Sequence, residues 1–323
     1  MLIDDKKEKQ DEEFRKLISH SKKVLRITEE ELWDTGKTLD SGAFGKIYKG
    51  EYRGHRVAIK CLNPKNRLSN YRELICLMEC HCPNIVGIIG AGPSPAKKCL
   101  MFIVMEFARN SSLHHLRSAR FDKRIGNPWQ VEYAMSHAFL WFLHAANGLE
   151  YLHEHCDPPK IHRDIKPGNM LLFDDCRLLK LCDFGTARDE DVSLTSHQGA
   201  IRYMAPEVFE PGTNGKPNRY DRSVDIYSLC ASFWEVFTRA DYPRYYQPIE
   251  GCPMMVQKLL RRGLSKKVEQ RPKIRDIVRF LEFVVKKISP LPPARCNLEF
   301  PPTELDEDES TVTVSANNFT EPN

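Results

Sequence analysis

The chain contains 323 residues, of which 41% are hydrophobic and 28% charged, a composition typical of a globular protein with one large domain or two smaller ones. No run reaches the roughly 18 consecutive apolar residues of a membrane helix, because histidine, asparagine and glutamate interrupt the most apolar stretch, 134–152. The net charge is +4, and it rises to +11 when the seven acidic residues after Cys296 are set aside. This moderately basic body suits phosphate-bearing ligands or acidic partners, but its charge is too diffuse to indicate nucleic-acid binding.

Residues 1–32 are predicted to form a charged leader. Its opening, "MLIDDKKEKQDEEF", has no apolar core and is therefore not a secretory signal. Position 2 is not glycine and no cysteine lies near the C-terminus, so neither common lipid anchor is expected. The eleven cysteines are expected to be free thiols. Together these features predict a cytoplasmic protein.

Short runs of β-branched and aromatic residues alternate with turns after Trp33. The runs "KIYKGEY", "HRVAIKCL", "NIVGIIGAG" and "CLMFIVMEF" each predict a strand, and together they predict an antiparallel sheet. One helical stretch, "NYRELICLMEC", interrupts them. Its apolar residues predict a buried helix face made of Tyr71, Leu74, Ile75 and Met78.

The pattern becomes mainly helical from Ser111 to Ile288. The segment 129–155 is apolar over a wide face, and "IRDIVRFLEFVVKKI" closes the region. Residues 289–323 are rich in proline and acid, which predicts a disordered tail. Within it, "PLPPAR" (290–295) has the proline and arginine spacing of a polyproline ligand for an SH3 domain, with a plain linker as the alternative.

Residues 39–47, "LDSGAFGKI", fit either a tight hairpin turn or a phosphate-binding loop. Phosphate-binding loops are rich in glycine because their backbone must approach the ligand closely. Asp40 stands where such a loop usually has its first glycine, and Gly42 and Gly45 match the second and third. The loop alone does not decide between the two interpretations.

Four further motifs follow this loop along the chain. "VAIK" ends at Lys60, and "HRDIKPGN" (162–169), "CDFGTA" (182–187) and "MAPE" (204–207) come after it. With the glycine loop, they make up the signature set of protein kinases in its usual order. The chain therefore resembles a protein kinase.

The resemblance covers residues 33–288 and implies an α+β fold of two lobes. The small lobe (about 33–108) is expected to hold an antiparallel sheet and one main helix, and the large lobe (about 109–288) to be mainly helical. The implied activity is transfer of the γ-phosphoryl group of ATP, with Mg²⁺, to protein hydroxyl groups.

The resemblance also implies roles for individual residues of the large lobe. Asp164 is expected to accept the proton of the substrate hydroxyl, and Lys166 to reach the transferring phosphoryl group. Asn169 and Asp183 are expected to bind Mg²⁺, which prefers carboxylate and carboxamide oxygens.

In the small lobe, Lys60 is expected to contact the α- and β-phosphates while a carboxylate holds its side chain in place. Glu73 is the first candidate for that carboxylate and Glu79 is the second, because both lie on the one predicted helix of this lobe. The residues expected to bind ATP are Leu39, Asp40, Ser41, Gly42, Ala43, Phe44, Gly45, Lys46, Ile47, Ala58, Lys60, Met105, Glu106, Ala108 and Leu171.

The phrases that flank the motifs indicate a branch of the family. Lys166 after "HRDI" matches serine/threonine kinases, and "LCDFGTAR", "MAPEVFE" and "IVMEFARNSSL" resemble the tyrosine-kinase-like group. Within that group the chain is most similar to the TGF-β-activated kinases, which act as MAP kinase kinase kinases. This similarity implies a protein substrate such as a MAP kinase kinase, in a stress or immune signalling cascade.

Three departures from the family pattern keep a second hypothesis open. Asp40 replaces a glycine, Ala200 replaces the usual serine or threonine, and the segment 235–270 is too short for a helix that such kinases normally have. The alternative is a catalytically weak scaffold with a kinase fold that binds nucleotide or partners.

Two sets of residues are expected to regulate or support the site. Ser193, Thr195 and Ser196 lie between "DFG" and "APE", where a phosphate could pair with Arg163. Structural roles are expected for Asp225, as a partner of the "HRD" backbone, and for an ion pair between Glu207 and Arg271.

Overall fold

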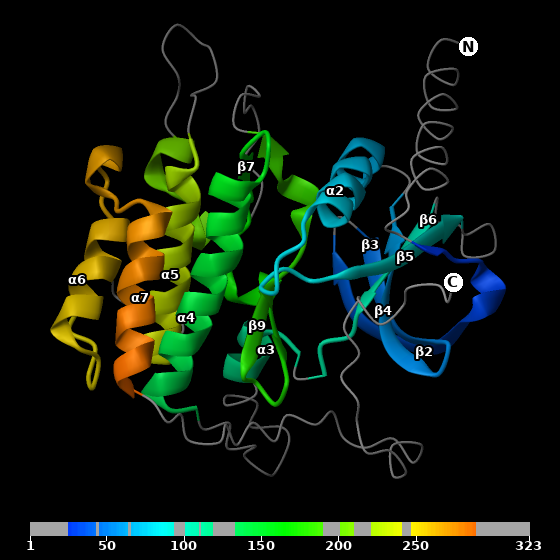
Figure 1. Cartoon of the computed structure of the whole chain (residues 1–323), viewed down its shortest axis with the longest axis horizontal. Coiled ribbons are helices and arrows are strands. Elements are labelled where there is room, and N and C mark those ends of the chain that lie inside the picture. Colours follow the sequence, from blue (N-terminus) through cyan, green and yellow to red (C-terminus); the bar gives the residue numbers. More distant parts are fainter. Residues whose placement is uncertain are drawn as a thin grey trace, which may run out of the picture. The chain divides into compact units, whose positions relative to one another are not determined.

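A computed structural model describes residues 25–42, 45–63, 66–93, 101–109, 111–118, 133–189, 201–209, 221–240 and 247–288. The chain divides into two compact units (Figure 1). The described residues of the first unit fall within Met1–His81 and Val86–Phe107, and those of the second within Cys82–Ile85 and Ala108–Thr311.

The first unit contains a six-stranded sheet with the order β1-β5-β6-β4-β3-β2. Its strands are β1 Leu25–Arg26, β2 Leu32–Gly42, β3 Gly45–Tyr52, β4 His55–Leu62, β5 Ile88–Pro93 and β6 Met101–Glu106. The pairs from β5 to β2 are antiparallel, as the alternating runs predict, and β1 is parallel to β5.

The sheet begins earlier than the sequence predicts. The sequence places Leu25 and Arg26 in the charged leader, but they pair with Gly90 and Ala91 of β5. Ile27 is fully buried and joins Tyr52, Phe102 and other apolar residues in the core of the sheet. Three residues are too few for an alternating pattern to stand out in a highly charged stretch, so this edge strand is visible only in the fold.

Helix α2, Arg67–Glu79, is the helix predicted for the first unit, but its buried face differs from the predicted one. Leu74 is buried as expected, whereas Tyr71, Ile75 and Met78 are only partly buried. Two polar residues take their place. The buried face carries Asn70, Glu73, Leu74 and Leu77.

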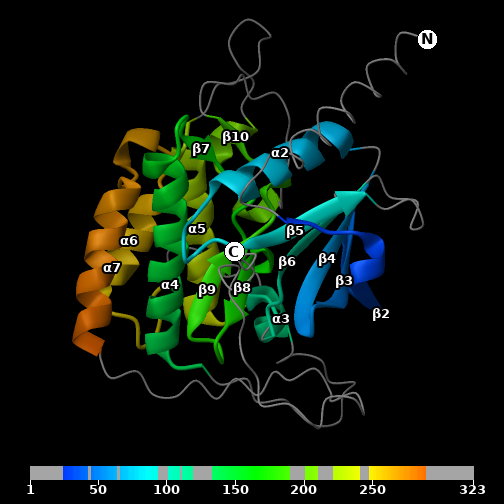
Figure 2. The same ribbon diagram turned by 45° about the vertical axis from the view of Figure 1, so that its right-hand side comes forward.

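The second unit is built on five α-helices among its described residues. They are α3 Leu113–Ser118, α4 Met135–Glu150, α5 Ser223–Thr238, α6 Met254–Gly263 and α7 Ile274–Ile288. Figures 1 and 2 both show α4, α5, α6 and α7 side by side. Two small antiparallel pairs complete the unit: β8 Met170–Phe173 with β9 Leu178–Leu181, and β7 Lys160–Ile161 with β10 Arg188–Asp189.

Large aromatic side chains form the centre of this helical unit. Trp141 of α4 and Trp234 of α5 are fully buried, and the rings of Phe142 and Phe233 stack with centroids 4.5 Å apart. Such pairs bury much apolar area, which fixes α4 against α5. The motifs "HRDIKPGN", "CDFGTA" and "MAPE" all lie in this helical unit.

The last helix of the second unit agrees with the sequence prediction. Helix α7 spans the predicted segment 274–288. Between α5 and α6, the described residues 239–240 and 247–253 form no helix. None of the helices in the described ranges is long and apolar enough to cross a membrane.

Candidate active site

Lys60 and Glu73 form a buried ion pair within the first unit. Lys60 Nζ lies 2.6 Å from Glu73 Oε1, and both residues are almost completely shielded from solvent. Glu79, the second candidate for this role, is exposed at the end of α2. A buried ammonium group needs such a partner because an unpaired charge is costly away from water. The pair fixes the Lys60 side chain on β4.

The glycine loop is the turn between β2 and β3. Asp40, Ser41 and Gly42 pair with Ile47, Lys46 and Gly45, so this stretch lies at the tip of a β-hairpin, and phosphate binding by the loop stays a prediction. Leu39 is half-buried, and Ala43 and Phe44 lie outside the described residues.

Gly45 meets a backbone requirement in this hairpin. Its φ is +143°, and an added Cβ would lie 2.2 Å from the Cys61 carbonyl oxygen of β4. Only glycine fits such a close approach of two backbones. Gly45 is therefore needed for the packing of β3 on β4, whatever it does toward a ligand.

The remaining predicted nucleotide residues of the first unit lie on β4 and β6. Ala58 pairs with Met105, and both side chains are buried. Ala58 and Lys60 are two residues apart on β4 and therefore face the same side of the sheet. The Glu106 N–H donates to the Gly87 carbonyl oxygen at 3.1 Å, which fixes the end of β6.

In the second unit, two polar side chains of the "HRDIKPGN" motif converge on one carboxylate, that of Asp164. Lys166 Nζ lies 2.6 Å from Asp164 Oδ2, and Asn169 Nδ2 donates to the same oxygen at 2.8 Å. Asn169 Nδ2 also donates to the Asp164 carbonyl oxygen at 2.8 Å. Asp164 itself is buried, whereas the Lys166 side chain is partly exposed. The loop thus presents an oriented carboxylate next to a cation.

Asn169 and Asp183 are brought together by the backbone. The Cys182 N–H, next to Asp183, donates to the Asn169 carbonyl oxygen at 3.0 Å. Asp183 adopts a left-handed conformation with φ of 64°, which aspartate tolerates better than most residues. Both donors of the Asn169 amide face Asp164, so its oxygen is the atom left to act as a ligand. One carboxylate and one carboxamide match the few protein ligands that Mg²⁺ takes beside phosphate and water.

Leu171 and Ala108 are also joined within the second unit. Ser112 bridges Leu171 of β8, and the neighbouring Ser111 donates its N–H to the Ala108 carbonyl oxygen at 3.2 Å. The loop that follows Ala108 is therefore tied to the hairpin that carries Leu171.

A family model described as "Protein kinase domain" matches residues 33–284. The chain belongs to the protein kinase family.

Two proteins named "Mitogen-activated protein kinase kinase kinase 7" are similar to this kinase. Those of Bos taurus and Homo sapiens are each 33% identical over 301 residues, which cover 88% of this chain and 48% and 46% of theirs. The Arabidopsis thaliana protein "Serine/threonine-protein kinase STY46" is 29% identical over 277 residues, covering 78% of this chain and 44% of its own. The kinase thus spans about half the length of the curated relatives it matches. These matches confirm the predicted resemblance to MAP kinase kinase kinases of the tyrosine-kinase-like group.

Asp225 of α5 anchors the catalytic loop of this kinase, as expected from the sequence. Its Oδ2 accepts the His162 N–H and its Oδ1 accepts the Arg163 N–H, each at 2.8 Å. The fully buried carboxylate has a pKa below its usual range. Burial by itself would raise this pKa, because it disfavours the charged form. The hydrogen bond from His153 is the largest of the interactions that lower it.

Two supporting residues were not predicted from the sequence. His153 is buried and its Nε2 lies 2.9 Å from Asp225 Oδ2, while Thr186 Oγ1 donates to the His162 carbonyl oxygen at 2.8 Å. Thr186 directly follows the "DFG" motif, so its position could have indicated from the sequence alone that it supports the site. His153 carries no such signal, because a histidine in "YLHEHC" reads as an ordinary helical residue.

The expected ion pair between Glu207 and Arg271 is confirmed. Arg271 Nη2 donates to Glu207 Oε2 at 2.8 Å, and Nη1 bonds the other carboxylate oxygen. The predicted phosphorylation sites Ser193, Thr195 and Ser196 lie outside the described residues, as does Ala200.

Proposed function

We propose that this chain is an active serine/threonine kinase that transfers the γ-phosphoryl group of Mg-ATP to protein hydroxyls. The observation that supports this most is the Asp164 carboxylate, whose Oδ2 is held by Lys166 at 2.6 Å and Asn169 at 2.8 Å. A base must be positioned within hydrogen-bond reach of the proton it removes. An oriented carboxylate beside a partly exposed cation meets that requirement for a hydroxyl substrate.

Each residue has a distinct task in this proposal. Asp164 accepts the hydroxyl proton as the substrate oxygen attacks, and Lys166 stabilises the negative charge that develops on the transferring group. Lys60, held by Glu73, orients the phosphates of ATP. Asn169 and Asp183 would hold Mg²⁺, which when bound offsets phosphate charge. The adenine would be bound by Ala58, Leu171 and the backbone near Glu106 and Ala108, with Met105 behind it.

Loss of the base is the first test of this function. Asp164→Asn is expected to lower phosphoryl transfer by about 10²–10⁴-fold while leaving ATP affinity nearly unchanged, since it removes the proton acceptor and keeps the shape. Lys60→Met is expected to abolish transfer as well. The measurement uses purified protein, labelled Mg-ATP and a generic basic protein substrate.

A matched control separates catalysis from surface charge. Asp174 is exposed in the turn between β8 and β9 and has φ of 49°, a conformation that asparagine also tolerates. Asp174→Asn makes the same chemical change as Asp164→Asn and should keep wild-type turnover. Wild-type turnover in Asp164→Asn or Lys60→Met would overturn the proposed function.

The substrate and the cellular setting are also proposals. The relatives named as MAP kinase kinase kinases support a protein substrate such as a MAP kinase kinase. On the same ground we propose that the kinase acts in a MAP kinase cascade of stress or immune signalling, in the cytoplasm. The SH3-binding segment 290–295 lies outside the described residues and stays a prediction.

One observation favours the second candidate, a weakly catalytic scaffold. The Asp40 carboxylate accepts the Ser41 N–H within the glycine loop at 2.7 Å, where a glycine would leave that donor available to a phosphate. Nucleotide binding with turnover no higher than that of Asp164→Asn would identify the chain as such a scaffold.

A further inference from the structure

Asp40 and Lys60 lie in one row across three strands of the first unit. Asp40 of β2 pairs with Ile47 of β3, and Ile47 pairs with Lys60 of β4. Directly paired residues project from the same face of an antiparallel sheet. With about 4.8 Å between neighbouring strands, their Cα atoms are about 10 Å apart. The face that presents the ammonium group of Lys60 therefore also carries a carboxylate.

A hydrogen bond holds this carboxylate at the loop. Asp40 Oδ1 accepts the N–H of Ser41 at 2.7 Å, although the residue is exposed. The bond limits the freedom of the side chain to turn away into solvent. The same bond occupies the Ser41 N–H. Glycine loops bind phosphate oxygens with backbone N–H groups of this kind. Asp40 thus adds a negative charge and removes a donor at the same place.

We propose that Asp40 sets the nucleotide preference of this site according to phosphate charge, so that the site selects the magnesium complex of ATP against free ATP. The proposal rests on the proposed function, because it places the phosphates on the Lys60 face. Magnesium cancels about two of the roughly four negative charges of ATP. Repulsion by a nearby carboxylate scales with the charge that remains, so free ATP is penalised most and uncharged adenosine not at all.

The test measures binding rather than turnover. The full chain is titrated calorimetrically with ATP in the presence of a chelator, with ATP in excess Mg²⁺, and with adenosine. Asp40→Asn should tighten free ATP by about tenfold, tighten the magnesium complex by about threefold, and leave adenosine unchanged. In about 0.5 M salt these gains should shrink, because exposed charges are screened.

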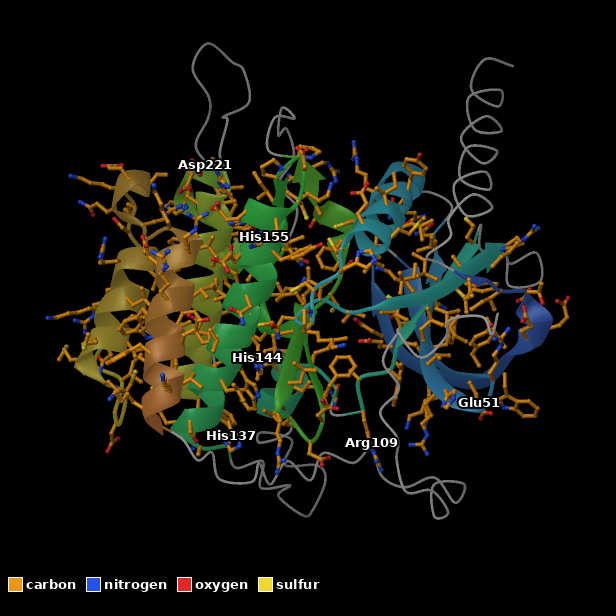
Figure 3. All side chains as sticks on the ribbon, viewed as in Figure 1. Glu51, Arg109, His137, His144, His155 and Asp221 are labelled. Atoms are coloured by element: carbon orange, nitrogen blue, oxygen red, sulfur yellow. The ribbon has the colours of Figure 1, made fainter. Side chains whose placement is uncertain are left out.

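Glu51 supplies the matched control. It is exposed on β3, pairs with Trp33 and Arg56 at the far end of the same hairpin, and is labelled in Figure 3. Asp40 lies seven positions after Trp33 on β2, a distance of about 23 Å along the strand. Glu51→Gln removes the same charge from the protein, and it should change none of the three affinities.

The outcomes separate this inference from the proposed function. Binding of ATP and adenosine by the wild type, with Asp40→Asn changing the two ATP affinities equally or not at all, overturns the charge preference and leaves the kinase proposal intact. A matching change in Glu51→Gln overturns it too, because the effect would then be one of net charge. Failure of the wild type to bind any of the three ligands overturns both.

Discussion

His144 of α4 is a histidine whose protonation the fold opposes. Its Nδ1 accepts the N–H of Leu179 in β9 at 3.3 Å, so the neutral ring serves as an acceptor. Burial lowers the pKa of His144 from 6.5 to about 4. The unfolded chain therefore binds more protons than the folded chain between these values, and stability falls as the pH drops from 6.5 toward 4.

Replacement of His144 by a residue that accepts a hydrogen bond but does not titrate should remove this dependence. At pH 5 the wild type is expected to lose about 2 kcal/mol of unfolding free energy through His144 that His144→Gln does not lose. Urea unfolding at pH 7 and pH 5 measures the difference. His155→Gln removes an exposed imidazole just beyond the same helix and is the control. Equal pH slopes for wild type and His144→Gln would contradict the argument.

At the scale of elements, Arg271 joins three segments of the second unit. Besides its two bonds to Glu207, its Nη1 lies 3.2 Å from the Ser223 carbonyl oxygen and its Nε donates to the Ser265 carbonyl oxygen at 3.0 Å. One guanidinium group thus connects the "APE" turn, the start of α5 and the loop before α7. Only arginine has the planar fork that makes these bonds together.

Removal of Arg271 should destabilise the second unit strongly. Arg271→Met leaves the Glu207 carboxylate buried without its partner, which costs about 3–5 kcal/mol. Glu207→Gln added to Arg271→Met should recover part of the loss, because the uncompensated charge disappears. Chemical denaturation of the single and double variants measures both effects.

An exposed ion pair gives the comparison for this prediction. Arg275 bonds Glu154 at 3.1 Å, but its side chain is 56% exposed. Arg275→Met is therefore expected to change the free energy of unfolding by about 1 kcal/mol or less. A similar loss in the two arginine variants would mean that burial does not decide the strength of these pairs.

Helix α2 shows where pattern alone fails at this scale. The apolar periodicity of 70–80 predicts the helix, but it selects Tyr71 and Ile75 for the buried face rather than Asn70 and Glu73. Glu73 is buried because Lys60, thirteen residues earlier, needs a partner. Apolar periodicity contains no information on such a pair, whereas the motif that identified Lys60 also pointed to Glu73. Helix α7 posed no such problem, because its buried residues Ile274, Ile277, Val278 and Leu281 are all apolar.

For the whole molecule, the order of five short motifs predicted the family and the α+β fold. These motifs can be recognised in the sequence because the chemistry requires each residue type at a fixed spacing. The parallel strand β1 and the buried His153 were not predictable, since their places depend on partners more than 60 residues away in sequence. Long-range pairing of this kind leaves no local pattern.

Regulation of the whole kinase is predicted to depend on phosphorylation between the "DFG" and "APE" motifs. The cation expected to receive a phosphate, Arg163, is buried and its Nη1 lies 3.5 Å from the Thr186 carbonyl oxygen. A phosphate adds charge-assisted bonds to such a guanidinium group and orders the segment that carries it. Mass spectrometry after incubation with Mg-ATP should find phosphate on Thr195 or Ser196, and none in Asp164→Asn.

The effect on activity distinguishes a regulatory phosphate from an incidental one. Joint replacement of Thr195 and Ser196 by alanine should lower phosphoryl transfer by about tenfold, the equivalent of one charge-assisted hydrogen bond lost from the active arrangement. If Arg163 binds this phosphate, Arg163→Gln should make the phosphorylated and unphosphorylated forms equally active. Full activity in the alanine variant, or a phosphate effect that survives Arg163→Gln, would show that the segment is ordered by other contacts.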